Sequence, residues 1–419
     1  MHKFEEMENT SKLSLFEQHF QETSIPGLQP MQSSARDYLN GQDFPTTRVE
    51  RFKYTRLTKL FNGISPDFSP IGIEKLKSHQ ICADAIAIFV GNGSVILPSD
   101  ELPKGLQIDF IQAASDLPQT NTKDVFAAMN VLYAHSGVRI QVDKNVVLEQ
   151  PIELVHVCSG AYAGYTRHAI NVGENAQAKF IMTYASESCM DAFSHVHTTL
   201  EVGASAHVTL EKIQMESAEI FSFVDEEVFQ DKESVFQINT MTLDGKLVRN
   251  DLHIQVQGEH AETHLNGMYM LNGQQHVSNY TTVDHQVPNC ESNELYKGMM
   301  DEKSMAVFNG KVFVRKDAQK TNAFQSNANV LISEDASVNS KPELEIYADD
   351  VKCSHGSTTG QLDDEAIFYL RARGLSEKSA KQLMLTAFMS DVLDKITIPA
   401  VKTMVYQTIN KRFNWELEL

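Results

Sequence analysis

A thiol and an imidazole stand two residues apart near the end of a long strand-rich stretch, at Cys353 and His355. If this segment is a strand, both side chains project from the same face, because strand side chains alternate with a period of two. A thiolate and a neutral imidazole are ligands suited to iron or zinc. The alternative is that Cys353 is a small buried hydrophobic residue and that His355 is a hydrogen-bonded turn residue.

Further imidazoles and thiols are scattered along the chain. Six histidines fall in or beside predicted strands, namely His195, His197, His253, His260, His264 and His285. They could line a path for iron, or they could be satisfied by backbone carbonyls and solvent. We expect Cys290 to be structural, and Cys82, Cys158 and Cys189 have no supporting context. The pair Asp349 and Asp350 is either solvated or guides Fe²⁺ as hard ligands.

Composition narrows the class of protein. A chain of 419 residues is expected to form two or three domains. Its net charge of −19 argues against nucleic acid or an anionic membrane as the main partner. The five cysteines form no CxxC pair, which fits a reducing compartment. No apolar run approaches the roughly 20 residues of a membrane span, and the first residues lack an apolar signal core. We therefore expect a cytoplasmic protein that does not span a membrane.

The hydropathy pattern divides the chain into three parts. Residues 1–135 are expected to be mainly helical, and residues 136–361 are rich in strands, beginning with the strict alternation of residues 138–142. Residues 362–419 return to a helical pattern. There Asp363 can cap one helix, which Gly374 would end, and a second helix begins near Ser376. We expect these helices to cover an open end of the strand-rich core or to dock a partner.

A short motif repeats within the strand-rich part. A turn-forming residue, two mostly polar residues and a small Ala or Ser precede a new strand at residues 173–176, 203–206, 231–234, 258–261, 301–304 and 333–336. Successive starts lie 30, 28, 27, 43 and 32 residues apart. Such a period indicates a solenoid, in which each coil buries its apolar face on its neighbours. The intervals hold strands rather than helical stripes, which favours a mainly β fold with a parallel β-helix core over a sandwich of antiparallel strands.

One helical stripe near the C-terminus is apolar enough to bind a partner. It comprises Leu383, Met384, Ala387, Phe388, Val392 and Ile396. The chain has no Walker A sequence, so any use of ATP must come from another protein. It also has too few clustered cysteines to hold a four-thiolate cluster alone. We therefore expect a metal site that another chain completes.

An ordered series of segments resembles the SufB/SufD family of iron–sulfur cluster assembly scaffold proteins, and its SufD branch in particular. The series runs through DHQVPNCESNELYKG at 284–298, FNGKVFV at 308–314, AQKTN at 318–322, KPELEI at 341–346, ADDVKCSHG at 348–356, GQLD at 360–363 and FYLRARG at 368–374. A weaker match is RVERFKYTRL at 48–57. A run this long is far more specific than a single Cys-x-His.

The resemblance implies a right-handed parallel β-helix between helical regions. It also implies a cytosolic complex with the paralogue SufB and two copies of the ABC-type ATPase SufC, supplied with sulfur by a cysteine desulfurase. In that picture a transient cluster forms at the SufB–SufD interface, where His355 matches the interface histidine of the family. Cys353 matches the pattern in position only, and the partner's thiol would come from SufB. The C-terminal helices would dock the ATPase through Leu383, Met384, Ala387, Phe388 and Val392.

The resemblance thus favours a non-catalytic scaffold subunit over two other classes. One is a β-helix carbohydrate-active enzyme with paired carboxylates, which the expected cytoplasmic location disfavours. The other is an acyltransferase built from hexapeptide repeats, whose period does not match. Flavin binding by the assembled complex stays open, and so does self-association of the chain through the strand edge that would otherwise face SufB.

Overall fold

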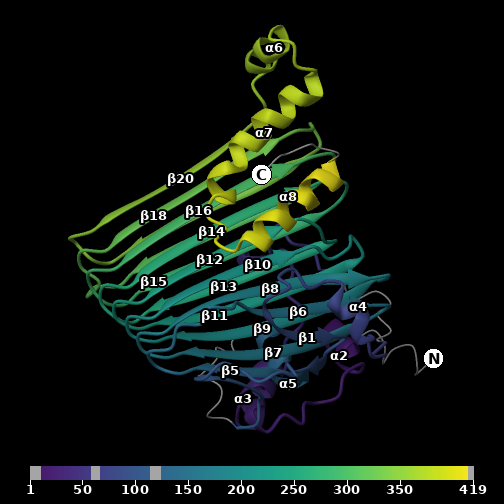
Figure 1. Cartoon of the computed structure of the whole chain (residues 1–419), viewed down its shortest axis with the longest axis vertical. Coiled ribbons are helices and arrows are strands. Elements are labelled where there is room, and N and C mark those ends of the chain that lie inside the picture. The colour runs from purple at the N-terminus through teal and green to yellow at the C-terminus, as the bar shows by residue number, and fades with distance from the viewer. Residues whose placement is uncertain (1–10, 58–66, 114–123, 414–419) are drawn as a thin grey trace.

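The protein is described by a computed structural model that covers residues 11–57, 67–113 and 124–413. Two long sheets face each other, and beyond the first coil the chain alternates between them, strand by strand (Figure 1). Almost every neighbouring pair of strands is parallel; the antiparallel pairs are β1 (Ile86–Gly91) with β2 (Ser94–Ile96) and β3 (Leu106–Phe110) with β5 (Val138–Val142). The expected mainly β fold with a parallel β-solenoid and flanking helices is confirmed.

The strands of each sheet follow a simple spatial order. From one end to the other, sheet A contains β2, β1, β6 (Ile152–Ser159), β8 (Gln177–Glu187), β10 (His207–Gln214), β12 (Val235–Thr242), β14 (Glu262–Leu271), β16 (Glu291–Met300), β18 (Asn322–Leu331) and β20 (Lys352–Gly360). In the same direction, sheet B contains β3, β5, β7 (Ala163–Val172), β9 (Ala192–Val202), β11 (Ile220–Gln230), β13 (Leu247–Val256), β15 (His276–His285), β17 (Met305–Val314) and β19 (Ser337–Ile346), and β4 (Ala134–Ser136) pairs beside β7.

Four of the six predicted repeats form turns that lead from sheet B to sheet A. A residue with φ between 54° and 63° recurs there, at Asn145, Asn175, Ser205, Glu233, His260, Asn289 and Lys320. At six of these seven positions its backbone N–H donates to a carbonyl of the next coil, as from Asn175 to Ala204 at 2.8 Å. The small residue that follows, such as Ala206, is fully buried. Two of the six predicted repeats, at 301–304 and 333–336, lie instead at the opposite turns, and this shift explains the irregular 43-residue interval.

Side chains of successive coils align in columns inside the solenoid, because the strands pair in register. One column in sheet A is apolar through its first five strands and then becomes polar. It consists of Ile152, Phe180, Leu210, Ile238, Leu265, Glu294, Gln325 and His355. The interior therefore changes from hydrocarbon to hydrogen-bonding groups toward β20.

Two interior tyrosines depend on glycines in the neighbouring strand. Tyr296 of β16 is in register with Gly267 of β14, and Tyr269 of β14 is in register with Gly298 of β16. A Cβ atom added at Gly267 would lie 2.1 Å from the Tyr296 ring, and one added at Gly298 would lie 2.1 Å from the Tyr269 ring. Each glycine thus leaves the space that the neighbouring phenol ring occupies.

The N-terminal segments pack on the outer face of sheet B, except α4 (Ile73–Lys77), which packs on β1 and β6 of sheet A. The others are α2 (Lys12–Glu17), η1 (Pro26–Leu28), α3 (Gln29–Leu39), η2 (Glu50–Phe52) and α5 (Val125–Tyr133). Phe126 of α5 stacks on Phe223 of sheet B with 4.6 Å between ring centroids. The first 135 residues are not mainly helical as expected, because β1, β2 and β3 lie among them; β2 and β1 form one end of sheet A, and β3 forms one end of sheet B.

Of the C-terminal helices, α7 (Glu377–Leu393) and α8 (Pro399–Phe413) lie across the outer face of sheet A, α6 (Asp364–Ala372) projects beyond β20, and none covers the end of the solenoid (Figure 1). The buried side chains of α7 and α8 pack on a methionine-rich surface that includes Met241, Met268 and Met299. The expectation that the helices close the open end is therefore wrong. Within the described residues, no helix is long and apolar enough to cross a membrane.

A buried ion pair inside the solenoid offers a test of this interior. Lys212 of β10 and Glu226 of β11 lie 2.8 Å apart and are each about 1% exposed. Replacing one partner leaves the other charge buried without a counter-ion, so Lys212→Met should lower the free energy of unfolding by about 3–5 kcal/mol. Urea denaturation followed by circular dichroism measures this. Adding Glu226→Leu should restore most of the loss.

The matched control is Lys179→Met, because Lys179 lies on the adjacent strand β8 but is exposed. A surface substitution of this kind should change stability by less than about 0.5 kcal/mol. Equal effects of Lys212→Met and Lys179→Met would contradict the role of the ion pair.

Candidate functional site at the open end of the solenoid

The last strand of sheet A has an unpaired edge. β20 pairs with β18 on one side, and no described strand pairs with it on the other. Almost all of its residues are exposed. β19 is likewise the last strand of sheet B. The two strands therefore form an open final coil whose backbone N–H and C=O groups are available to another strand.

Cys353 lies in this final coil with its side chain partly covered. It is in register with the buried Ala323 of β18 and packs against a small apolar cluster that includes Val312 and Ala318. Burial raises the pKa of its thiol, and a backbone hydrogen bond with Ala323 opposes that shift. Cys353 is therefore neither a fully buried hydrophobic residue nor a fully exposed ligand, but a half-buried thiol at an accessible edge.

His355 lies within β20 and not in a turn, so the turn-residue alternative is wrong. It is in register with Gln325, whose side chain is buried and donates to Glu294 at 2.6 Å. Since strand side chains alternate, Cys353 and His355 share the face that continues the interior of the solenoid. His355 is nevertheless exposed, because among the described residues no later strand follows β20 in the sheet. It thus presents an imidazole at the open end of the polar column.

Hydrogen bonds join the final coil to the polar interior. The Ser357 hydroxyl donates to Ser340 of β19 at 2.7 Å, and Ser340 donates to Asn327 of β18 at 2.7 Å. Asn327 in turn donates to the Tyr269 hydroxyl at 3.0 Å. This network joins β20 to β19 of the facing sheet and, through β19, to β18. The pattern that could have revealed it is the alternation of polar residues in 325–329, within a stretch otherwise typical of a buried strand.

The other predicted histidines do not form one cluster, although His195 and His197 both lie near Asp225. His195 contacts Asp225 at 2.8 Å on the outer face of sheet B, whereas His285 contacts Ser292 at 2.9 Å inside the solenoid. Burial lowers the pKa of His197 and of His285 to about 4, which keeps both neutral at pH 7. In the parts of the chain that the structure describes, no group of three or more His, Cys, Asp or Glu could hold a metal ion.

The remaining cysteines are separate from the final coil. All five thiols are free. Cys290 is buried in a turn, where its thiol donates to the carbonyl of Gly258. Cys158 and Cys189 share a small apolar cluster, and burial raises the pKa of Cys189 to about 11. A protonated thiol is a poor ligand, so these cysteines are suited to packing.

The predicted stripe on α7 is displaced around the helix from the stripe that is buried. The residues that pack inward are Ala380, Leu385, Met389, Val392 and Leu393. Of the five predicted contacts, Leu383 is 50% exposed, Ala387 is exposed, and Met384 and Phe388 are half-buried. Val392 is fully buried against sheet A, so it anchors the helix.

Exposed apolar residues gather instead on the α6–α7 hairpin. Phe368 and Tyr369 of α6 are 73% and 58% exposed, and Leu375 and Leu383 are also exposed. Figure 1 shows α6 beyond β20, clear of both sheets. We call these four residues the hairpin surface. Sequence reasoning missed its aromatic part, although two adjacent aromatics in a short capped helix were a visible signal.

The protonation of Cys353 makes its reactivity testable. Because burial raises the pKa of this thiol, little thiolate is present at pH 7, and the thiolate is the form that reacts. Alkylation of Cys353 by iodoacetamide should therefore be slower than that of glutathione at pH 7.5, and its rate should still rise between pH 8 and pH 10. Peptide mass spectrometry resolves the site. A rate that levels off below pH 8 would contradict this assignment.

The chain is similar in sequence to known proteins over most of its length. Residues 156–388 match the family model described as the SufBD core domain of the SUF system for FeS cluster assembly. The chain is 28% identical to the iron–sulfur cluster assembly protein SufD of Escherichia coli (strain K12), over 98% of this chain and 95% of that protein. It is 33% identical to an iron–sulfur cluster assembly SufBD family protein of Synechocystis, over 72% of this chain and 69% of that protein. The chain therefore belongs to the SufBD family of iron–sulfur cluster assembly proteins.

Proposed function

We propose that this chain is a non-catalytic scaffold subunit of a cytoplasmic complex, in which a nascent iron–sulfur cluster forms between its final coil and a SufB paralogue. The observation that carries the proposal is the position of His355, exposed on the unpaired last strand of the solenoid. Family membership supports the same role and leaves the alternative of a carbohydrate-active enzyme without support. Sulfur would reach the complex from a cysteine desulfurase.

The open edge suits a partner with the same kind of fold. Unpaired strand edges are ready to pair with another chain, and a paralogous solenoid would present an edge of similar length. β20 spans nine residues and β19 ten. In the absence of the paralogue, a second copy of this chain could occupy the same edge and form a homodimer.

The chemistry of the final coil suits a cluster that is cargo. One imidazole and one partly buried thiol leave most coordination positions to the partner, so the cluster would not be held by this chain alone. His355 would supply an imidazole nitrogen as a ligand, and Cys353 is the weaker candidate because burial raises the pKa of its thiol. A site divided between two chains can open when the chains move apart, which would allow release.

The hairpin surface is the proposed docking site of the SufC ATPase. It stands clear of the sheets and presents aromatic side chains, which are enriched among residues that anchor interfaces. Leu383 belongs to it, whereas Val392 serves the attachment of α7 to sheet A. Deleting residues 363–419 would therefore remove the hairpin surface and also uncover the methionine-rich face of sheet A, so the deletion does not test the docking site alone.

His355→Ala should leave the fold intact and impair cluster assembly. The side chain is exposed, so thermal unfolding should change little, whereas the loss of a ligand should lower assembly by roughly tenfold or more. Maturation of an iron–sulfur enzyme in a strain that depends on this chain measures the effect, and Cys353→Ala should be milder. The control is His207→Ala, an exposed histidine at the start of β10. Normal maturation with His355→Ala would exclude the role.

The double substitution Phe368→Asp and Tyr369→Asp should weaken ATPase binding without unfolding the solenoid. Both side chains are more than half exposed, and buried aromatic anchors are typically worth about 2 kcal/mol or more each at an interface. Co-purification with SufC measures binding, and circular dichroism checks the strands. Met190→Asp is the control, because Met190 is 68% exposed on a turn between β8 and β9. Undiminished co-purification would move the docking site elsewhere.

A further inference from the structure

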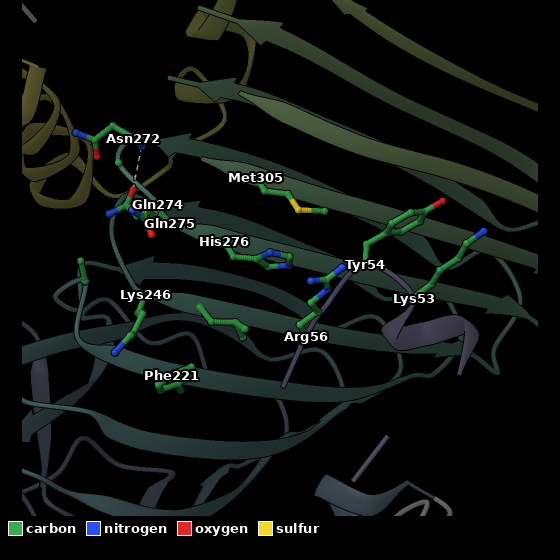
Figure 2. Close-up of a pocket in the computed structure, with 13 residues that line it drawn as sticks. Lys53, Tyr54, Arg56, Phe221, Lys246, Asn272, Gln274, Gln275, His276 and Met305 are labelled. Atoms are coloured by element: carbon green, nitrogen blue, oxygen red, sulfur yellow. Dashed lines mark hydrogen bonds between the residues drawn. The ribbon is translucent and has the colours of Figure 1, made fainter. Parts of the chain in front are cut away.

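A concave pocket, separate from the final coil, lies between the N-terminal segment and sheet B. It has a volume of about 820 Å³, within the range of small-molecule pockets. It is formed where the segment after η2 crosses the ends of β11, β13, β15 and β17 (Figure 2). In the view of Figure 2, His276 and Arg56 lie between Lys246 on one side and Lys53 and Tyr54 on the other.

The lining of this pocket is positively charged although the chain carries a net charge of −19. It includes Lys53, Arg56 and Lys246, and no carboxylate is among its lining residues. Lys246 is compensated by Asp191 at 2.6 Å and lies over the Phe221 ring. Lys53 and Arg56 are exposed, and neither makes an ion pair with a carboxylate within the described residues. The pocket therefore has two cations without a carboxylate partner among the described residues, Arg56 and Lys53, and the Lys53 ammonium lies over the Tyr54 ring.

His276 gives the pocket a neutral hydrogen-bonding group. Burial lowers its pKa to about 4, and the nearby Arg249 adds to the shift. Its Nε2 atom lies 2.9 Å from the Ser278 hydroxyl, which also contacts the Thr55 hydroxyl at 2.8 Å. The imidazole is thus held in a fixed orientation and can take part in a hydrogen bond without contributing charge.

The loop at 272–275 is fixed by contacts from outside the pocket. Arg412 of α8 donates to the side-chain oxygens of Asn272 and Gln275. The backbone N–H of Asn272 donates to the Gln275 side chain at 3.0 Å, and that of Gly273, with φ 62°, donates to Glu302 at 2.6 Å. Gln274 lies between these fixed residues and is exposed. A loop held in this way loses little entropy when a ligand binds.

Apolar side chains complete the walls of the pocket. The lining beside the cations includes the aromatic side chains of Tyr54 and Phe221 and the apolar side chains of Leu247 and Met305. We propose that this pocket binds a small phosphorylated molecule with a flat heteroaromatic body, of the size of a nucleoside monophosphate. Arg56 and Lys53 bind the phosphate, the amide of Gln274 and the imidazole of His276 bind polar atoms, and Tyr54 and Met305 contact the body of the ligand.

The test uses the purified full-length chain without an ATPase. AMP and UMP serve as probes, with adenosine and inorganic phosphate for comparison, and binding is measured by isothermal titration calorimetry at pH 7.5. At least one of the two nucleotides should bind saturably and more tightly than either fragment. Combining Arg56→Gln with Lys53→Gln should weaken that binding by about tenfold or more, since two charge-assisted contacts are lost.

The matched control is Lys144→Gln, an exposed lysine at a turn outside the pocket. It should bind the nucleotide as the unaltered chain does, and circular dichroism should show the same strand content for all variants. No saturable binding of either nucleotide at about 1 mM would overturn the proposal. So would equal affinity for nucleotide and inorganic phosphate, since the pocket would then hold an adventitious ion only. Unchanged affinity in the double variant would place the nucleotide elsewhere.

Discussion

The in-register parallel pairing of coils is the constraint on which the rest of this structure depends. Each side chain lies directly beside its counterpart in the previous coil, so a change of residue type alters the packing of its neighbours in the same column. Apolar columns exclude water and supply most of the stabilisation. A polar residue in such a column must find its partner in a neighbouring coil or in the facing sheet, as Lys212 finds Glu226 across the interior.

The same constraint explains why the candidate site has the chemistry it has. Toward β20 the interior column passes from Leu265 to Glu294 and Gln325, and the strand that follows them carries His355. The imidazole therefore emerges from a hydrogen-bonded interior and not from an apolar one. Because the coils stop there, a residue in an interior position becomes a surface residue. The end of the repeat creates the site, without a loop or a cleft.

Much of the fold could be predicted from the sequence, because solenoid coils repeat local signals. The small residue after each left-handed turn position, such as Ala176 or Ala206, marks the coils directly. The first strands escaped prediction because β2 and β3 are short and stand among polar and proline-rich residues. The buried stripe of α7 was misplaced because Leu383, Met384 and Leu385 are consecutive and apolar, so that their order alone does not determine which one faces the sheet.

The site was predictable in part for a related reason. The two-residue spacing of Cys353 and His355 determines that they share a face of a strand. Their exposure depends on where the stacking ends, and the placement of the C-terminal helices decides this. A helix packed against β20 would have buried it. Instead, α7 and α8 pack on the methionine-rich outer face of sheet A. No local pattern near residue 353 contains that information.

Polar clamps attach α7 and the segment after it rigidly to the side of the solenoid. Lys297 of β16 binds the Phe388 carbonyl at 2.7 Å and the Asp391 carboxylate at 2.6 Å. Farther along, Asn239 donates to the Lys395 carbonyl at 2.9 Å, and Glu211 accepts from Thr397 at 2.8 Å. The part of the α6–α7 hairpin that projects beyond β20 is thus anchored to sheet A near Lys297. A sideways force on the hairpin would therefore be transmitted to sheet A as a torque.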